Sequence, residues 1–112
     1  MKYMCLIYTD PNVTPPMGDS MNAAYFDLNR RMKEAGVMIS GDALQPTRTA
    51  TSLRKRGDKV ETMDGPFAET REHLGGYYVI DCPDLDQALH WAAQIPGAAY
   101  GTVEVRPLVV FG

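Results

Sequence analysis

The spacing of hydrophobic residues changes along the chain, and each change marks a boundary between predicted elements. Residues 2–9, KYMCLIYT, form a β-rich run with apolar side chains at positions of both parities. The run ends at DPNVTPP, whose prolines cannot continue a central strand. We therefore expect a strand in the middle of a sheet, followed by a loop.

The next segment has the spacing of an amphipathic helix. Its apolar positions recur at intervals of four, three, four and three residues: Met21, Tyr25, Leu28, Met32 and Ala35. Ser20 is the expected N-cap, and Gly36 is expected to end the helix. Residues 37–44 then start directly after the glycine and halt before Pro46, which predicts a second strand.

A β-hairpin is predicted in the middle of the chain. The segments TATSLRKR and KVETMD flank the dipeptide Gly57-Asp58, a two-residue turn with glycine in its first position. After residues 64–74, the run GGYYVIDC predicts another strand. The paired glycines Gly75 and Gly76 favour a β-bulge or a close approach of two backbones there.

A second helix and a last strand complete the pattern. Asp84 and Gln87 have the spacing of a capping box, so the helix should begin near Leu85 and end at Pro96-Gly97. Its predicted apolar stripe consists of Leu85, Ala88, Leu89, Ala92 and Ile95 or Ala93. His90 and Trp91 flank this stripe and are expected to be partly exposed packing residues. The segment GTVEVRPLVVF predicts the final strand.

The order of these elements is the split βαβ layout of an α+β, ferredoxin-like domain with an inserted β-hairpin. Two helices can cover only one face of its sheet. The other face would carry apolar and aromatic side chains from three strands: Tyr3 or Met4, Tyr77 or Tyr78, and Val103 or Glu104. Because a small monomer rarely exposes such a patch, we expect a symmetric homodimer that packs sheet against sheet.

Length, charge and cysteine content limit the class of protein. The 112 residues fit one domain, 1–112, and the net charge of −3 argues against direct nucleic-acid binding. Cys5 and Cys82 lie in apolar runs without other ligands at metal-binding spacing, which favours buried reduced thiols. No signal peptide or transmembrane segment is apparent, so we expect a cytoplasmic protein without membrane contact.

The motif DGPFAETREHLGGYYVIDCPDLDQALHWA, together with MKYMCLIY, AGVMISGDALQPT and VEVRP, resembles the YciI-related proteins of the DGPF type over nearly the whole chain. The resemblance implies a dimeric α+β barrel of ferredoxin-like subunits. Proteins of this type are often labelled as transcription-initiation proteins, and their genes commonly lie beside those of extracytoplasmic-function sigma factors, so the resemblance also implies an association with a sigma factor. A histidine of the first half and an aspartate are the catalytic pair proposed for YciI proteins proper. Here both histidines, His73 and His90, lie in the second half, so that pair is not transferred.

The DGPF motif begins at a predicted corner of the chain. Gly65 precedes Pro66 and is therefore expected to be extended, while Pro66 would open a helical turn. The Asp64 carboxylate then either caps backbone N–H groups at this corner or takes part in catalysis. Capping is the more frequent role for an aspartate before Gly-Pro.

A helical turn over residues 66–73 would place Glu69, Glu72 and His73 on one face. Such a group can exchange protons, with Asp64 and Glu72 as the candidate catalytic residues. A solvated charged face is the alternative, and metal binding is disfavoured because no firm third ligand follows. Arg71 could hold a substrate carboxylate or pair with its acidic neighbours. The candidate substrate-binding residues are Phe67, Glu69, Arg71, Tyr77 and Arg106.

Two functional hypotheses remain open from the sequence. One is a small enzyme or small-molecule-binding protein that works by acid/base chemistry without a cofactor or metal, in a pocket near the DGPF loop. The other is a non-catalytic interaction or regulatory module, with a sigma factor as a possible partner. In that hypothesis the motif acts as a rigid structural corner.

Overall fold

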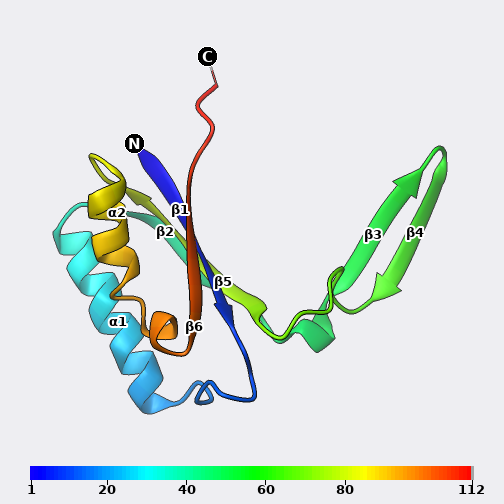
Figure 1. Ribbon diagram of the computed structural model, residues 1–112, viewed down its shortest axis with the longest axis horizontal. Coiled ribbons are helices and arrows are strands. Elements are labelled where there is room, and N and C mark those ends of the chain that lie inside the picture. Colours follow the sequence, from blue (N-terminus) through cyan, green and yellow to red (C-terminus); the bar gives the residue numbers. More distant parts are fainter. Residues whose placement is uncertain (112) are drawn as a thin grey trace.

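Residues 1–111 are described by a computed structural model, in which two helices lie on one face of a four-stranded antiparallel sheet (Figure 1). The sheet has the strand order β2-β5-β1-β6, and a separate pair, β3-β4, forms a two-stranded ribbon. The strands are β1 (Lys2–Thr9), β2 (Met38–Ala43), β3 (Thr51–Arg56), β4 (Lys59–Asp64), β5 (His73–Asp81) and β6 (Gly101–Pro107). This order is that of a ferredoxin-like α+β domain, with β1 in the centre as predicted.

Helix α1 (Asp19–Glu34) buries the stripe that its sequence predicts. Leu28 and Met32 are fully buried, and the chain leaves the helix through Gly36, whose φ of 74° is easily adopted only by glycine. The predicted N-cap is one correction. The helix begins two residues earlier than expected, with Gly18 as N-cap and Ser20 inside the first turn.

Helix α2 (Leu85–Ala92) starts as predicted, because the Asp84 carboxylate accepts a hydrogen bond from the Gln87 backbone N–H at 2.9 Å. The predicted stripe is shifted, however. Ala88, Ala92 and Ile95 are buried, whereas Leu85 and Leu89 lie at the margin and are about half exposed. The small alanines let the helix lie close to the sheet, and Trp91 packs against the core on the opposite flank.

The hydrophobic core lies between the sheet and the two helices. Alternate residues of β1, namely Tyr3, Cys5 and Ile7, point towards the helices together with Tyr78 and Ile80 of β5. The two free thiols, Cys5 and Cys82, are buried as predicted, and burial raises the pKa of Cys5 to about 11. Within residues 1–111, neither helix is long and apolar enough to cross a membrane.

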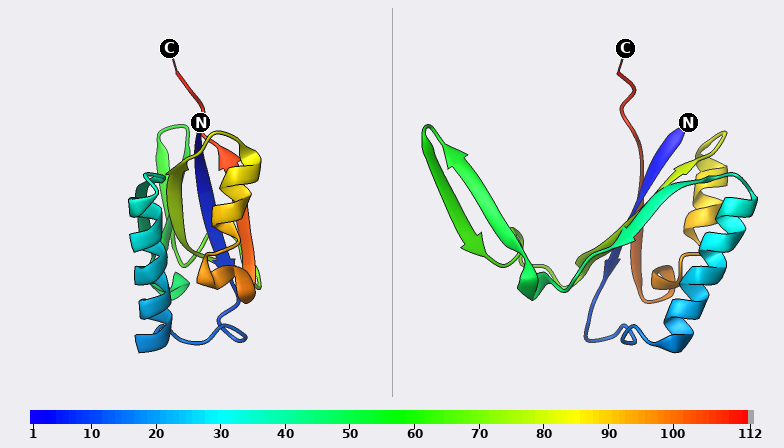
Figure 2. Two further views of the ribbon diagram at one scale, coloured as in Figure 1. Left: turned by 90° about the vertical axis from the view of Figure 1, so that its left-hand side faces the viewer. Right: turned by 180° about the vertical axis from the view of Figure 1, so that it is seen from behind.

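The opposite face of the sheet has no covering layer in the chain as described (Figure 2). It carries the other residues of β1 and their cross-strand neighbours: Met4, Leu6, Tyr8, Tyr77, Val79, Glu104 and Arg106. The sequence left open which residue of each neighbouring pair faces this side of the sheet. In the structure these residues are Met4, Tyr77 and Glu104. We call this surface the open sheet face.

The ribbon β3-β4 projects away from the sheet on the side opposite the helices, and we call residues 51–64 the arm (Figure 1). Its strands pair in register around Gly57-Asp58, as predicted, with Arg56 opposite Lys59 and Thr51 opposite Asp64. Gly57 has a φ of 59°, which suits the tight turn of a two-residue hairpin. The arm is therefore an insertion between the neighbouring strands β2 and β5.

Candidate functional site

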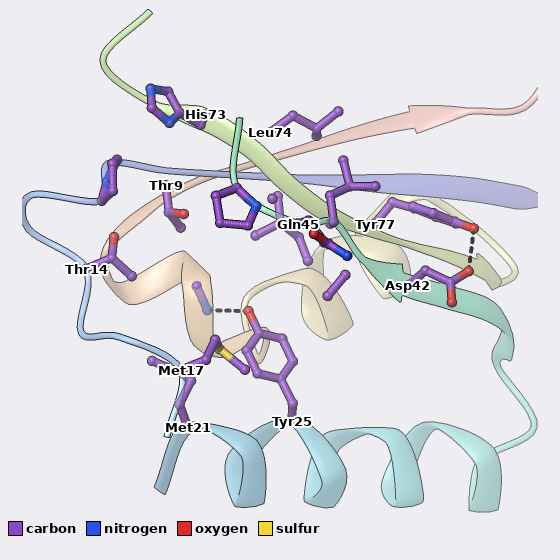
Figure 3. Close-up of a pocket in the computed structure, with 18 of the residues that line it drawn as sticks. Thr9, Thr14, Met17, Met21, Tyr25, Asp42, Gln45, His73, Leu74 and Tyr77 are labelled. Atoms are coloured by element: carbon purple, nitrogen blue, oxygen red, sulfur yellow. Dashed lines mark hydrogen bonds between the residues drawn. The ribbon is translucent and has the colours of Figure 1, made fainter. Parts of the chain in front are cut away.

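A cavity of about 930 Å³ lies between the first half of α1, the loop of residues 11–17 and the ends of β2 and β5 (Figure 3). Two glycines widen this region, because a Cβ at Gly41 would stand 2.6 Å from the Tyr78 ring and one at Gly76 would stand 2.9 Å from the Asp42 carbonyl oxygen. Gly76 thus marks the close backbone approach that the sequence predicts. Gly75 is the extra residue of a bulge opposite Ile7 and Tyr8, which turns β5 at the edge of the cavity.

The walls of the cavity are mainly apolar. Proline, methionine and aromatic side chains of the loop and of α1 form one wall, and the sheet forms the other: Pro11, Pro15, Pro16, Met17, Met21 and Phe26 face Ile7, Leu44 and Leu74. A pocket of this size and composition fits a small organic molecule better than an ion.

Tyr25 brings a hydroxyl group to the middle of the cavity (Figure 3). Its oxygen accepts a hydrogen bond from the Gly97 backbone N–H at 3.2 Å, which fixes the ring. Burial raises the pKa of Tyr25, an effect only partly opposed by the hydrogen bond from Gly97, so the phenol stays protonated at neutral pH. Since the hydroxyl proton has no acceptor within residues 1–111, it is free to bind a ligand oxygen.

A second donor follows one helical turn later. The Tyr78 hydroxyl donates to the Asn29 side-chain oxygen at 2.5 Å, and burial raises the pKa of Tyr78 to about 12. This bond uses the side-chain oxygen of Asn29 and leaves its two amide N–H groups for other partners. The described part of the chain provides no acceptor for them. Tyr25 and Asn29 are four residues apart and therefore lie on one face of α1.

The mouth of the cavity lies beside residues 44–48, which lead into the arm and which we call its root. The Thr47 hydroxyl and the His73 Nδ1 are 3.3 Å apart, and Gln45 and Arg48 line the same rim. His73 supplies the one imidazole among the described residues that line the cavity, and imidazole is the side chain that most often transfers protons in enzymes. The cavity thus has two neutral donors inside and one group able to exchange a proton at its entrance.

Tyr77 and Asp42 also border the cavity, but their side chains belong to the other side of the sheet. They are opposite one another in the β2-β5 pairing, next to the pair of Gly41 and Tyr78, which faces α1. The Tyr77 hydroxyl donates to the Asp42 carboxylate at 2.8 Å, and this bond raises the pKa of Tyr77. Tyr77 therefore presents its polar end at the open sheet face.

The structure places most of the sequence-predicted site residues away from this cavity. Of the seven candidates, Tyr77 borders it, whereas Asp64, Phe67, Glu69, Arg71, Glu72 and Arg106 do not. Phe67 is largely exposed and packs against the Arg54 guanidinium, 5.1 Å from the ring centre. Arg106 lies on β6, where its guanidinium is 3.8 Å from the Glu104 carboxylate on the same face of the strand.

The helical turn expected after Asp64 is wrong. Residues 65–72 form an irregular loop, and Gly65 adopts a φ of 96° instead of the expected extended conformation, which turns the chain without a helix. Glu69, Glu72 and His73 consequently share no helix face. The expected cap is also absent: the Asp64 carboxylate accepts no hydrogen bond from the chain between residues 1 and 111. Nowhere in that range do three acidic, histidine or cysteine side chains gather as a metal site.

Sequence reasoning missed the two donors of the cavity. Tyr25 was assigned to the apolar stripe of α1, where its ring does belong, and its hydroxyl gave no separate signal. Asn29 follows Tyr25 at the spacing of one turn, which is the pattern that brings two side chains together on a helix. The signal in the sequence was the polar side chain of Asn29 directly after the apolar Leu28, which could have indicated a polar group at the edge of the buried stripe.

Comparison with known proteins agrees with this fold. A structure of 5-chloro-2-hydroxyhydroquinone dehydrochlorinase from Burkholderia phenoliruptrix AC1100, in complex with 2,5-dihydroxybenzoquinone, matches with a TM-score of 0.52. That match covers 97% of this chain and 94% of the other at 11% identity, so it shows a shared fold alone.

Two sequence comparisons reach further. An uncharacterized protein of Rhizobium meliloti (strain 1021) is 39% identical over 117 residues, which cover 99% of this chain and 94% of that protein. The family model of the YCII-related domain matches residues 1–112. The chain therefore belongs to the YCII-related domain family.

Proposed function

We propose that this protein binds a small aromatic molecule with at least one oxygen substituent in the cavity beside α1. The observation that carries the proposal is the pairing of apolar walls with two unspent donors, the Tyr25 hydroxyl and the Asn29 amide, on one face of α1. Apolar walls favour a ring through burial of its surface, and a few polar groups fix its orientation.

The protonation states of the two tyrosines limit the class of ligand further. Both Tyr25 and Tyr78 keep their protons at neutral pH because burial raises their pKa values. A neutral phenol and an amide donate to a carbonyl, phenolate or carboxylate oxygen without requiring a full negative charge on the ligand. The structural neighbour supports this class, because its bound 2,5-dihydroxybenzoquinone is a planar ring with several oxygens.

His73 extends the proposal from binding to acid/base chemistry without a cofactor. Its ring lies at the mouth of the cavity, held by the Thr47 hydroxyl at 3.3 Å, where a ligand hydroxyl could transfer a proton to it. Asp64 and Glu72 stay predictions as catalytic residues, since neither lines the cavity of its own chain. The regulatory module with a sigma factor as partner likewise stays a prediction.

The binding proposal is tested by calorimetric titration of 2,5-dihydroxybenzoquinone, hydroquinone and phenol into the wild type, Tyr25→Phe and Tyr8→Phe. The matched control, Tyr8→Phe, removes a hydroxyl from a residue of the open sheet face that does not line the cavity. We expect the oxygenated rings to bind the wild type and the control equally. Tyr25→Phe should bind about tenfold more weakly, the effect of one lost hydrogen bond.

Two results would overturn the proposal. One is the absence of binding to the wild type at millimolar concentrations of all three rings. The other is a wild-type affinity of Tyr25→Phe, because the ring would then bind elsewhere. The role of His73 is a separate question, and His73→Gln should leave the affinity within a factor of about three, because the ring lies at the mouth of the cavity and not beside the two donors.

A further inference from the structure

The mouth of the cavity carries a permanent positive charge. Arg48 lines the cavity at the root of the arm, directly after Thr47. Among the described residues that line the cavity, Arg48 is the only arginine or lysine, and Asp42 is the only carboxylate. A guanidinium stays charged throughout the pH range of a folded protein, whereas the inner donors, Tyr25 and Asn29, are neutral. The mouth and the interior of the cavity therefore differ in charge.

The Arg48 guanidinium has no partner in the described part of the chain. Within residues 1–111, it takes part in no ion pair and no side-chain hydrogen bond. Arg30 of α1, by contrast, binds the carboxylates of Asp27 and Glu34. Because Arg48 is exposed and unpaired, its guanidinium keeps all its N–H donors for a partner outside the chain. An unpaired arginine on a bare surface is usually only solvated, so the neighbours of Arg48 decide between solvent and a ligand.

Three further polar side chains line the same rim. The Thr47 hydroxyl and the His73 ring are in contact at 3.3 Å, and the Gln45 amide lies beside them in the lining. Hydroxyl, imidazole and amide groups can each donate a hydrogen bond to an anionic oxygen next to a guanidinium. Asp42, the one carboxylate of the lining, lies at the other end of the cavity from His73 and accepts a hydrogen bond from Tyr77 (Figure 3). Within the lining, an anion at the rim therefore meets donors and no second anion.

The cavity is larger than a single ring requires. Its volume of about 930 Å³ lies near the upper end of the range for pockets that enclose drug-sized ligands. Figure 3 shows Tyr25 and His73 on opposite sides of this space. A lone ring bound at Tyr25 and Asn29 would therefore leave the donors of the rim unused. A ligand that reaches both sides needs a second polar group, carried on a chain away from its ring oxygen.

We propose that the ligand is an aromatic acid with a ring oxygen at one end and a carboxylate on a short chain at the other, and that Arg48 selects it by binding the carboxylate. This inference rests on the proposed function, because it assigns the second end of the same ligand. The planar guanidinium matches the two oxygens of a carboxylate, and one cation among neutral donors suits a single charge better than the nearly double charge of a phosphate. The net charge of −3 does not attract anions from a distance, so selection depends on contact with Arg48.

The test is calorimetric titration of 4-hydroxyphenylpropionate and of its uncharged amide into the wild type, Arg48→Gln and Arg56→Gln, at about pH 7.5, where the acid is ionised. The control, Arg56→Gln, removes the same charge from the exposed end of the arm, outside the cavity lining, so an effect of net charge alone would appear in both variants. We expect the wild type and the control to bind the acid roughly tenfold more tightly than the amide, because the bond to Arg48 is charge-assisted. Arg48→Gln should bind the two compounds within a factor of about two.

A measurement without substitutions covers the case in which a variant fails to fold. Raising the salt concentration from roughly 0.05 M to 0.5 M should weaken binding of the acid to the wild type several-fold and leave the amide unaffected, because salt screens an exposed ion pair.

Three results would overturn the inference: equal affinities of the wild type for acid and amide, a preference for the acid that survives in Arg48→Gln, or a loss of that preference in Arg56→Gln as well. Each of these leaves the proposed function standing, provided that Tyr25→Phe still weakens the binding of both compounds. Failure of the wild type to bind either compound or the three rings named above would instead refute the proposed function, and the inference with it.

Discussion

The hydrogen bond between Tyr78 and Asn29 ties the central sheet to α1, and its contribution to stability can be measured with a double-mutant cycle. Tyr78→Phe removes the donor and leaves the Asn29 oxygen without its partner. Because Asn29 is only partly buried, water can replace the bond, and we expect a cost near 1 kcal/mol. Asn29→Ala leaves the hydroxyl of the 5% exposed Tyr78 unpaired, which should cost about 1–3 kcal/mol.

The double variant should cost less than the sum of the single variants, because the second change removes a group that has already lost its partner. We expect a coupling energy of about 1 kcal/mol. Asparagine is a poorer helix former than alanine, but this difference cancels in the cycle. For a chain of 112 residues, 1 kcal/mol corresponds to a shift in Tm of about 4 °C.

The assay is urea unfolding followed by far-ultraviolet circular dichroism, with free energies extrapolated to water. A matched control cycle uses Tyr77→Phe and Asp42→Ala, each of which removes one partner of a hydrogen bond on the open sheet face. Its coupling should be clearly smaller, because solvent screens that exposed pair. Additive effects of Tyr78→Phe and Asn29→Ala, within about 0.3 kcal/mol, would refute the inferred bond and with it the free amide of the cavity.

Two further predictions concern the surroundings of Tyr78. Gly41→Ala places a Cβ 2.6 Å from the Tyr78 ring and should lower the free energy of unfolding by about 1–3 kcal/mol. The control, Gly75→Ala, should be tolerated, because its Cβ would stand 3.8 Å from the Thr9 hydroxyl. Equal urea midpoints for the two variants would contradict this prediction. Burial raises the pKa of Tyr78 to about 12, so its contribution to stability is complete below the unfolded pKa of about 10 and is lost as pH rises towards 12. Urea midpoints between about pH 9 and pH 11 should fall less steeply for Tyr78→Phe than for the wild type, and parallel curves would argue against the shift.

The elements that could be predicted from sequence are those whose signal is local. The strand at residues 2–9, the Asp84 cap and the Gly57-Asp58 turn each depend on a few neighbouring residues, and all three occur as expected. Pairing rules then give the sheet order from the order of the elements. The error of two residues at the start of α1 arises because Asp19, like Ser20, suits a helix terminus.

The candidate site was harder to predict because it depends on contacts between distant segments. The charged residues of the DGPF motif are conspicuous in the sequence. Gly65, however, turns the chain without a helix, so these residues lie in an irregular loop and do not line the cavity. Tyr25 and Tyr78 are 53 positions apart in the sequence and meet only when α1 packs on the sheet. Hydroxyl and amide groups next to apolar positions carry little signal until the packing is known.

The insertion of the arm between two paired strands also has a consequence for folding kinetics. β2 and β5 pair up to Ala43 and Gly76, so everything between them is the loop of one long hairpin. If the arm forms first around Gly57-Asp58, it shortens the effective loop by about half and lowers the entropy cost of closing the sheet by roughly 0.6 kcal/mol. The arm would thus speed formation of the sheet from which it projects, by bringing the ends of β2 and β5 together early.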